Sequence, residues 1–326
     1  MSSVLRSAIT GVGGYLPERQ VSNADLTQIV DTSDEWITER TGIRNRHYAA
    51  ADQGTSDLAV EAAKAALQAA GRTAQDLDLI IVATTTPDLT FPSTAALVQA
   101  KLGAPVCAAF DVQAVCTGFV YALSVADGFV ARGRSRCALV IGADRMSSLL
   151  DWTDRSTCVL FGDGAGAVVL EPCAGQGTSA DRGILGFALR SDGTKQEMLT
   201  ADGGVSSNGQ VGKLRMQGNQ VFRHAVINIA EAVEAAAADA GVTIAEVDWF
   251  IPHQANQRIL NGVAHRLGLD ENKVVSTVAQ HANTSAASIP LAFSQAVADG
   301  RVKPGQLLLF EAMGGGLTWG ACAARF

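Results

Sequence analysis

Two stretches, DLIIVATTT at residues 78–86 and DWFIPHQA at residues 248–255, decide the fold class of this chain. Each is an apolar run that begins with an aspartate, seven residues after a glycine (Gly71 or Gly241) that ends an alanine-rich stretch of helical character. A helix, a glycine and a buried strand in this order are typical of βα units around a mainly parallel sheet. The 170-residue separation of the two stretches indicates an internal repeat.

Further landmarks keep the same order in both halves. The corresponding positions are Gly103 with Gly268, Gly133 with Gly300, and Leu139 with Leu307. One such pair would carry no weight, because helix, glycine and strand recur in every doubly wound fold, but five pairs in order favour a duplicated α/β architecture. We therefore expect two βαβ-type halves, residues 1–174 and 175–326, with EPCAGQGTSADR (171–182) as their connector.

The composition is that of a globular protein. Of the 326 residues, 48% are hydrophobic and 17% are charged, which excludes a disordered chain. A net charge of −7 offers no basic field for a nucleic acid. The N-terminal MSSVLRSAITGVGGYLP lacks the sustained apolar region of a signal peptide and is typical of a short strand and a turn. No apolar run reaches transmembrane length, so we expect no membrane partner. The six cysteines show no pattern of a disulfide framework, which predicts a reducing cytoplasm.

The cysteines predict neither a disulfide framework nor a zinc site, because no two of them form a CxxC pair. They are Cys107, Cys116, Cys137, Cys158, Cys173 and Cys322. We expect no metal, and most of these thiols should be inert, buried groups. Cys116 differs, because an apolar strand ends and an amphipathic helix begins around it in AAFDVQAVCTGFVYALSVADGFV. The amides of a helix N-terminus favour an anion, which predicts a lowered thiol pKa and a nucleophilic Cys116.

Two polar residues of the second half are candidates to act with Cys116. His253 directly follows the strand VDWFI, at the carboxyl end where sites of α/β folds collect. Asn283 lies 15 residues after Gly268, much as Cys116 lies 13 residues after Gly103, so the repeat predicts that Asn283 and Cys116 face each other. A lone histidine is often structural, and an asparagine in a turn is normally a turn former.

Three glycine clusters were considered as ligand sites. GVGGYLP at 11–17 and GDGAGAVVL at 162–170 both fail the spacing of a dinucleotide-binding fingerprint, so they predict a turn and a tightly packed strand. The run 314–316 lets backbone amides approach a ligand and is a candidate oxyanion hole, although a tight turn would have the same sequence.

The motifs taken together resemble those of the β-ketoacyl-acyl carrier protein synthase III family, the initiating condensing enzymes of bacterial fatty acid synthesis. They cover essentially the whole chain: DTSDEWITERTGI (31–43), TFPS (90–93), FDVQAVCTGF (110–119), TDR (153–155), FGDGAG (161–166), PHQAN (252–256), HANTSAAS (281–288) and GGGLTWG (314–320). The resemblance implies a thiolase-like fold with layers in the order αβαβα. The catalytic Cys-His-Asn set of the family falls on Cys116, His253 and Asn283.

The resemblance also implies the substrates and the other site residues. Acetyl-CoA would be the primer and malonyl-acyl carrier protein the extender, with no further cofactor. The implied oxyanion hole is formed by the amides of Cys116 and Gly315, and Phe91 would line the acyl pocket of the partner in a homodimer. The implied coenzyme A contacts are Thr32, Trp36, Arg40, Arg155 and Asn256, with Trp36 and Arg155 on either side of the adenine. The implied carrier-protein contacts are Arg223, Arg258 and Arg266.

The sequence departs from the pattern of the family at two places, and three alternative functions stay open. Val115 stands where small residues are common in the family, which leaves the chain length of the primer open, and His265 with Arg266 replaces a pair of lysines. One alternative is a condensing enzyme of secondary metabolism that uses the same three residues on other thioesters. A papain-like hydrolase shares the Cys-His-Asn set but not the sequence signature around its cysteine. The third alternative is a non-catalytic binding protein, which an intact nucleophile argues against.

Overall fold

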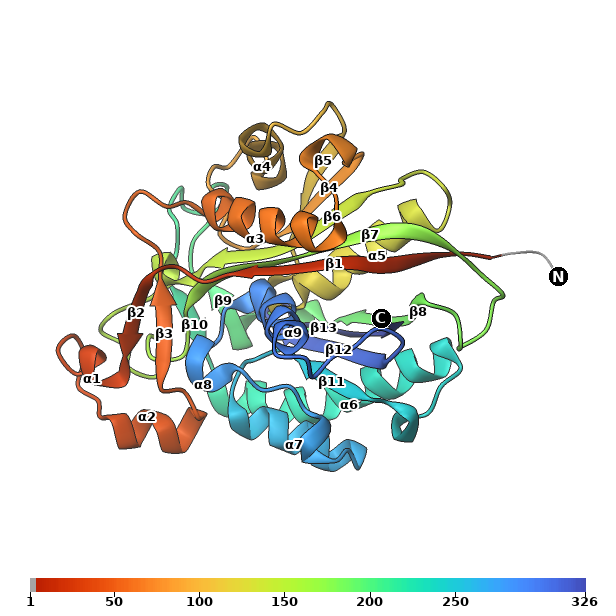
Figure 1. Ribbon diagram of the computed structural model, residues 1–326. Coiled ribbons are helices and arrows are strands. Elements are labelled where there is room, and N and C mark those ends of the chain that lie inside the picture. The colour runs from red at the N-terminus through yellow and green to blue at the C-terminus, as the bar shows by residue number, and fades with distance from the viewer. Residues whose placement is uncertain (1–3) are drawn as a thin grey trace.

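Two sheets with equivalent strand orders form the framework of the computed structural model, which describes residues 4–326 (Figure 1). Residues 1–3, part of the predicted first half, lie outside the described residues. The first sheet has the order β1-β7-β6-β4-β5, with β1 (Val4–Tyr15), β4 (Leu79–Ala83), β5 (Ala108–Val112), β6 (Ala138–Arg145) and β7 (Asp163–Gly175). The second has the order β8-β13-β12-β11, with β8 (Gly183–Ser191), β11 (Trp249–Pro252), β12 (Leu307–Gly314) and β13 (Thr318–Arg325).

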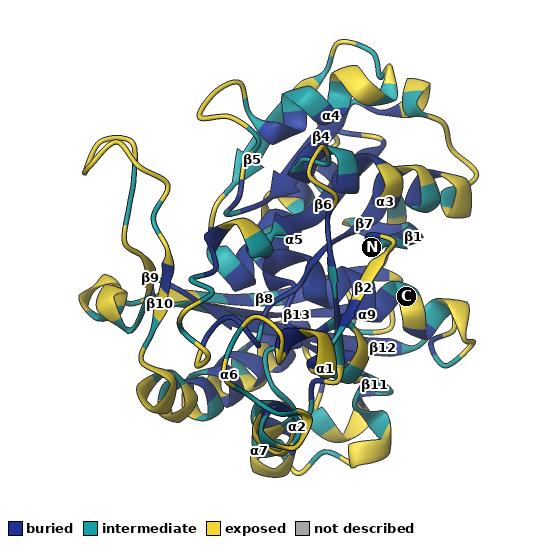
Figure 2. Cartoon of the chain, turned by 90° about the vertical axis from the view of Figure 1, so that its left-hand side faces the viewer, coloured by how far each residue is buried: buried dark blue, intermediate teal, exposed yellow. Residues whose placement is uncertain are grey.

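Helices cover both outer faces and fill the space between the sheets, which gives five layers in the order αβαβα (Figure 1). The helices are α3 (Thr55–Ala70) and α4 (Thr94–Leu102) on the first sheet, α5 (Gly118–Val130) and α9 (Ser288–Ala298) in the middle, and α6 (Gly218–Ala240) and α7 (Gln257–Leu267) on the second sheet. The expected α/β class and layering are confirmed. Every residue of β4 and β12 is buried, because helices cover both faces of each sheet (Figure 2).

The internal repeat holds in the strand register. Leu79 of β4 pairs with Ala138 of β6, and Trp249 of β11 pairs with Leu308 of β12; each second-half residue comes 170 positions after its counterpart. The 3₁₀ turn Val115–Thr117 precedes α5, and the 3₁₀ turn Ser285–Ala287 precedes α9 at the same offset. The counterpart of Cys116 is therefore Ala286. Asn283, expected near that place, lies three positions before it, because the loop after Gly268 is longer than the loop after Gly103.

Two local expectations also need correction. The glycines of GVGGYLP do not form a turn, because β1 continues through Tyr15 and a Cβ at Gly13 would collide with the backbone of Ala66 in α3. The connector is shorter than 171–182, because β7 extends to Gly175 and pairs with β1 there. The strand predicted over 162–170 is confirmed. The first sheet draws its strands from 4–175 and the second from 183–325, and the division at 174 and 175 stays a prediction.

A smaller lobe closes one end of the layers. It contains the antiparallel pair of β2 (Arg19–Ser22) and β3 (Asn45–Tyr48), connected through α1 (Asn23–Leu26) and α2 (Asp34–Thr41). The short helix α8 (Val278–His281) packs against β3. Ile37 of α2 and Phe161 belong to one buried cluster in this lobe. A second hairpin, β9 (Leu199–Ala201) and β10 (Leu214–Met216), approaches the same region. No helix within residues 4–326 is long and apolar enough to cross a membrane.

Candidate active site

Cys116 lies in a 3₁₀ turn between the end of β5 and the start of α5, only 3% exposed. Its turn is bound to the first residue of β13 by reciprocal hydrogen bonds: the Thr117 hydroxyl donates to the Thr318 carbonyl (3.0 Å), and the Thr318 hydroxyl donates to the Ala114 carbonyl (2.9 Å). A Cβ at Gly314 would lie 2.7 Å from the Cys116 amide nitrogen, so only glycine fits there. The two halves of the repeat therefore meet at the turn that carries Cys116.

The electrostatic setting of this thiol differs from the sequence prediction. Burial raises the pKa of Cys116 to about 12, although a hydrogen bond from Ser285 acts in the opposite direction. The amides at the start of α5 favour the thiolate, but the loss of water around the sulfur outweighs them. The predicted lowering of the pKa is wrong in direction, and the thiol is protonated at neutral pH.

His253 directly follows β11 and is held by its backbone and by its ring. Its N–H donates to the Glu311 carbonyl of β12 (2.8 Å), and its Nδ1 lies 2.6 Å from the Ser288 hydroxyl oxygen. Burial lowers the pKa of His253 to about 3, because the imidazolium would lose its hydration. The ring is therefore neutral at physiological pH.

Asn283 is fixed in one orientation by three contacts. Its N–H donates to the Leu160 carbonyl (2.9 Å), and its own carbonyl accepts from the Gly162 N–H (3.0 Å). Its side-chain oxygen accepts from the Ser285 N–H (2.9 Å). Because Oδ1 is engaged, the amide nitrogen Nδ2 has its two protons available, and no hydrogen bond of Nδ2 is formed within residues 4–326.

Cys116, His253 and Asn283 line one cavity of about 410 Å³. Its remaining wall is mostly apolar, with Leu199 and Met216 from the β9–β10 hairpin, Ile229 from α6 and Met313 from β12. At the polar end the lining includes Trp36, Arg40, Asn256 and Arg258. A buried thiol, a neutral imidazole and an amide N–H donor on a mainly apolar cavity can form a thioester and stabilise a developing negative charge.

Other predicted site residues lie outside the lining of this cavity. Gly315 packs against Leu199, where a Cβ would lie 2.8 Å from the Leu199 carbonyl. Phe91 is 83% exposed in the segment between β4 and α4. The buried hydroxyl of Thr32 has no hydrogen-bond partner within residues 4–326.

Trp36 forms the centre of the polar end of the cavity. The guanidinium carbon of Arg40 lies 4.6 Å from the centre of the indole ring, and that of Arg155 lies 5.1 Å from it. Arg155 also donates to the Asp31 carbonyl (2.9 Å), and the Asn256 amide donates to the Arg40 carbonyl (3.1 Å). Because Arg155 already contacts the indole, a purine could enter between them only after the guanidinium moved.

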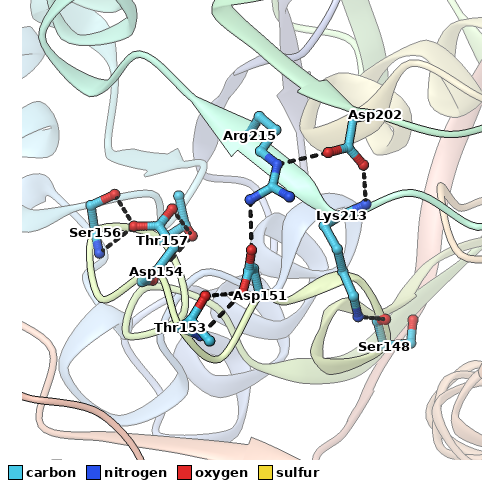
Figure 3. A network of polar contacts seen from close by, with 9 residues as sticks. All are labelled: Ser148, Asp151, Thr153, Asp154, Ser156, Thr157, Asp202, Lys213 and Arg215. Atoms are coloured by element: carbon cyan, nitrogen blue, oxygen red, sulfur yellow. Dashed lines mark hydrogen bonds and ion pairs between the residues drawn. The ribbon is translucent and has the colours of Figure 1, made fainter.

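The segment that carries Arg155 is braced against the β9–β10 hairpin (Figure 3). Arg215 of β10 binds Asp151 through Nη1 and Asp202 through Nε, each at 2.7 Å. Hydrogen bonds from Thr153 and Arg215 lower the pKa of Asp151 to about 2. The network joins residues 148–157, which lead into the cavity wall at Val159, to the hairpin that supplies Leu199 and Met216.

The predicted carrier-protein arginines lie on neighbouring helices, Arg223 on α6 and Arg258 and Arg266 on α7. All three are exposed, and none forms an ion pair within the described part of the chain. Only Arg258 lines the cavity. No group of three or more His, Cys, Asp or Glu side chains within residues 4–326 is arranged to hold a metal ion.

Sequence reasoning did not predict the backbone strain and several of the contacts that shape this site. Among the described residues, the non-glycine residues with positive φ are Val115 (50°), Ala282 (57°) and Ser285 (52°), which adjoin Cys116 and Asn283. Such strain is common at functional sites, but no residue type at these positions announces it. Thr318 and Ser288 were within the quoted motifs, and only the fold shows their contacts with the Cys116 turn and with His253.

Comparisons with known proteins agree over the whole chain. Residues 110–193 match the family model "3-Oxoacyl-[acyl-carrier-protein (ACP)] synthase III", and residues 237–326 match the model of its C-terminal part. A beta-ketoacyl-[acyl-carrier-protein] synthase III of Caulobacter vibrioides is 73% identical over 98% of this chain and 100% of its own length. One of Rhodospirillum centenum is 60% identical over 99% of each chain.

Solved structures show the same agreement. The 3-oxoacyl-[acyl-carrier-protein] synthase III of Aquifex aeolicus superposes with a TM-score of 0.91 at 47% identity, covering 98% of this chain and 100% of its own. The priming beta-ketosynthase of the R1128 polyketide pathway superposes with a TM-score of 0.93 at 36% identity, covering 100% and 98%.

Proposed function

Because the chain belongs to the 3-oxoacyl-[acyl-carrier-protein] synthase III family, we propose that Cys116, His253 and Asn283 condense an acyl-CoA primer with malonyl-acyl carrier protein. The family resemblance and the thiolase-like fold that the motifs implied are confirmed. The enzyme is a condensing acyltransferase of fatty acid synthesis, and this function is favoured over the one in secondary metabolism. The observation that carries the residue assignment is that these three buried residues line one cavity.

The first half-reaction transfers the primer, acetyl-CoA, to Cys116. The sulfur attacks the thioester carbonyl, the bond to coenzyme A breaks, and the thiol proton of Cys116 leaves with coenzyme A as its thiol. The amides of Cys116 and Gly315 are proposed to hold the oxyanion. Glycine at position 314 is compatible with this role, because a side chain there would collide with the Cys116 amide nitrogen.

The second half-reaction generates the carbon nucleophile from the malonyl group. The bond to its carboxylate breaks, carbon dioxide leaves, and the electron pair forms an enolate whose oxygen accepts hydrogen bonds from His253 and Asn283. The engaged Oδ1 of Asn283 supports this role, because it leaves Nδ2 as a donor. The neutral state of His253 supports it as well, since the ring donates without first taking up a proton.

Condensation completes the cycle. The enolate carbon attacks the acyl-Cys116 carbonyl, a carbon-carbon bond forms, and the thiolate of Cys116 leaves and takes a proton from solvent. The product is a 3-oxoacyl-acyl carrier protein. The atoms and electrons of the two thioesters, with this one proton from solvent, account for all products, and no oxidant, reductant or metal is a reactant.

Substrate binding is proposed to use the polar end of the cavity. Trp36, Arg40, Arg155 and Asn256 would bind coenzyme A, with Thr32 nearby, and their position beside the cavity that contains Cys116 supports this. Adenine would displace Arg155 from the indole face. Acyl carrier proteins are acidic, so Arg223, Arg258 and Arg266, which have no intramolecular ion pair within residues 4–326, would form the carrier-protein patch.

The enzyme is further proposed to act as a homodimer in the cytoplasm. β5 is an edge strand of the first sheet, and the segments beside it expose Leu89, Phe91 and Val106. Exposed apolar side chains beside an open strand edge support a protein interface, in which Phe91 would reach the acyl pocket of the partner. All six cysteines are free, as a reducing compartment would leave them. Sedimentation of the wild type and of Phe91→Asp tests the dimer.

The central experiment follows the two half-reactions separately. After mixing with acetyl-CoA, mass spectrometry should find one acetyl group on Cys116 and none in Cys116→Ser. His253→Ala and Asn283→Ala should still acylate, whereas decarboxylation of the malonyl group should fall on the order of 100-fold. Slow acylation with normal decarboxylation in both variants would invert the assigned roles.

A further inference from the structure

The contact between His253 and Ser288 joins two segments of the active site. Ser288 is the first residue of α9 and 2% exposed, and its hydroxyl oxygen lies 2.6 Å from Nδ1 of His253. The same oxygen accepts a hydrogen bond from the Gln254 N–H (3.2 Å). Ser288 therefore holds both His253 and the residue after it, five positions beyond Asn283.

The number of available protons shows which group is the donor in the hydrogen bond between Ser288 and His253. A serine hydroxyl has one proton to donate and two lone pairs to accept with. The Gln254 N–H uses one lone pair, and the serine proton has no other partner than His253 Nδ1 within residues 4–326. If Nδ1–H were the donor, Ser288 would accept twice and its own proton would be buried without a partner, an arrangement that proteins avoid.

We infer that Ser288 is a positioning residue that donates its hydroxyl proton to Nδ1 of His253 and so fixes the imidazole tautomer with the proton on Nε2. The ring edge opposite Nδ1 then presents an N–H to the cavity that His253 lines. This inference rests on the proposed function for its catalytic meaning, because an Nε2–H is the form that can donate to an enolate oxygen. The burial that lowers the pKa of His253 keeps the ring neutral, so the tautomer determines which nitrogen donates.

The arrangement gives both proposed enolate donors the same kind of support. Ser285 N–H occupies the oxygen of Asn283, which leaves the amide N–H₂ as the free group. Ser288 O–H occupies Nδ1 of His253, which leaves Nε2–H as the free group. Both hydrogen bonds come from the segment 285–288 at the start of α9. This one segment therefore leaves an N–H group free to donate on each of the two side chains.

The tautomer can be measured without any reaction. In protein with ¹⁵N-labelled histidine, the His253 signals, assigned by their loss in His253→Ala, should show a protonated Nε2 and an unprotonated Nδ1 at pH 7. In Ser288→Ala the two nitrogens should become more alike, because the donor that selects one tautomer is gone. The matched control is Ser135→Ala, which removes another buried serine hydroxyl, hydrogen-bonded to Asp78, and should leave the His253 signals unchanged. A protonated Nδ1 in the wild type would overturn the inference.

Kinetics give the second measurement. If loss of the donor lets the two tautomers populate about equally, decarboxylation in Ser288→Ala falls about twofold at unchanged KM for the malonyl substrate. Acylation of Cys116 should stay near the wild-type rate, which also shows that the variant is folded. Ser288→Thr, which keeps a hydroxyl, should recover most of the loss. Unchanged decarboxylation in Ser288→Ala would overturn the inference, whereas a wild type that neither acylates nor decarboxylates would instead reject the proposed function.

Discussion

Gly314 packs against Cys116 so closely that a Cβ at position 314 would lie 2.7 Å from the Cys116 amide nitrogen and 3.2 Å from its Cβ. The contact joins the last residue of β12 in the second half to the turn Val115–Thr117, which carries Cys116, in the first half. The amide of Cys116 is a proposed oxyanion donor. A side chain at position 314 that moves this N–H should therefore slow acylation, the first half-reaction.

Gly314→Ala should therefore slow acylation by acetyl-CoA by about 100-fold, the usual cost of losing one oxyanion donor. The control is Gly128→Ala in α5, where a Cβ meets nothing within 4 Å. That change should leave acylation unaltered and raise the free energy of unfolding by up to about 1 kcal/mol, because alanine is the better helix former. Rapid-quench acylation and urea unfolding measure the two effects. Equal acylation rates in both variants would contradict the proposed role of this contact.

The two half-reactions should differ in their pH dependence. With a pKa of about 12, the thiolate fraction of Cys116 rises about tenfold for each pH unit below that value, so acylation should accelerate steadily from pH 6 to 9. Decarboxylation should show no loss on the acid side down to about pH 5.5, because His253, with a pKa of about 3, stays neutral. If the acylation rate levelled off near pH 7, the pKa of Cys116 would be lowered, as the sequence predicted. If the decarboxylation rate fell to half near pH 6.5, His253 would titrate as an exposed histidine does.

Trp36→Ala should raise the KM for acetyl-CoA by about 10-fold or more, since stacking of a base on an aromatic ring is worth about 1–3 kcal/mol. Trp36→Phe should keep much of the affinity because it retains a flat ring. Acetyl-pantetheine, which has the thioester but no adenine, serves as the control substrate and should react equally with all three proteins. If Trp36→Ala reduced acylation by acetyl-CoA and by acetyl-pantetheine equally, the indole would have a structural role and would not bind adenine.

Arg258→Glu should reduce use of malonyl-carrier protein roughly 10-fold through weaker encounter with an acidic partner, while acylation by acetyl-CoA stays near wild type. Arg134→Glu makes the same change of charge in the exposed loop before β6, at the opposite end of that strand from the site, and should have little effect. Added salt should slow the carrier-dependent step of the wild type. Equal losses in the two variants, or rates indifferent to salt, would argue against this docking surface.

Glu311 should make stability depend on pH. Its side chain is 1% exposed, its Oε2 has no hydrogen-bond partner within residues 4–326, and burial raises its pKa to about 8 from 4.5. Between pH 4.5 and 8 the folded chain keeps this proton and the unfolded chain releases it. The free energy of unfolding therefore falls as the pH rises, by up to about 1.4 kcal/mol per unit from this group.

Glu311→Gln removes this dependence, so its stability relative to wild type should increase from pH 5 to pH 8 in urea unfolding. Glu61→Gln, which changes an exposed carboxylate paired with Lys64 on the surface of α3, is the control and should follow the wild type at every pH. Parallel profiles for the wild type and Glu311→Gln would mean that Glu311 titrates at its ordinary pKa in the folded chain.

The repeat and the α/β class follow from the sequence alone, because strand hydrophobicity and helix-ending glycines are local signals that recur at a nearly constant spacing. The resemblance to the family rests on short motifs, which are local as well. The sequence also pointed to Cys116 and His253, since each adjoins the end of an apolar run. How these residues are held depends on the three-dimensional fold. The pKa of Cys116 depends on how much water the whole fold excludes, the donor state of His253 depends on a hydroxyl 35 positions away, and the counterpart of Cys116 depends on loop lengths. These properties arise from contacts between distant segments, which no local pattern records.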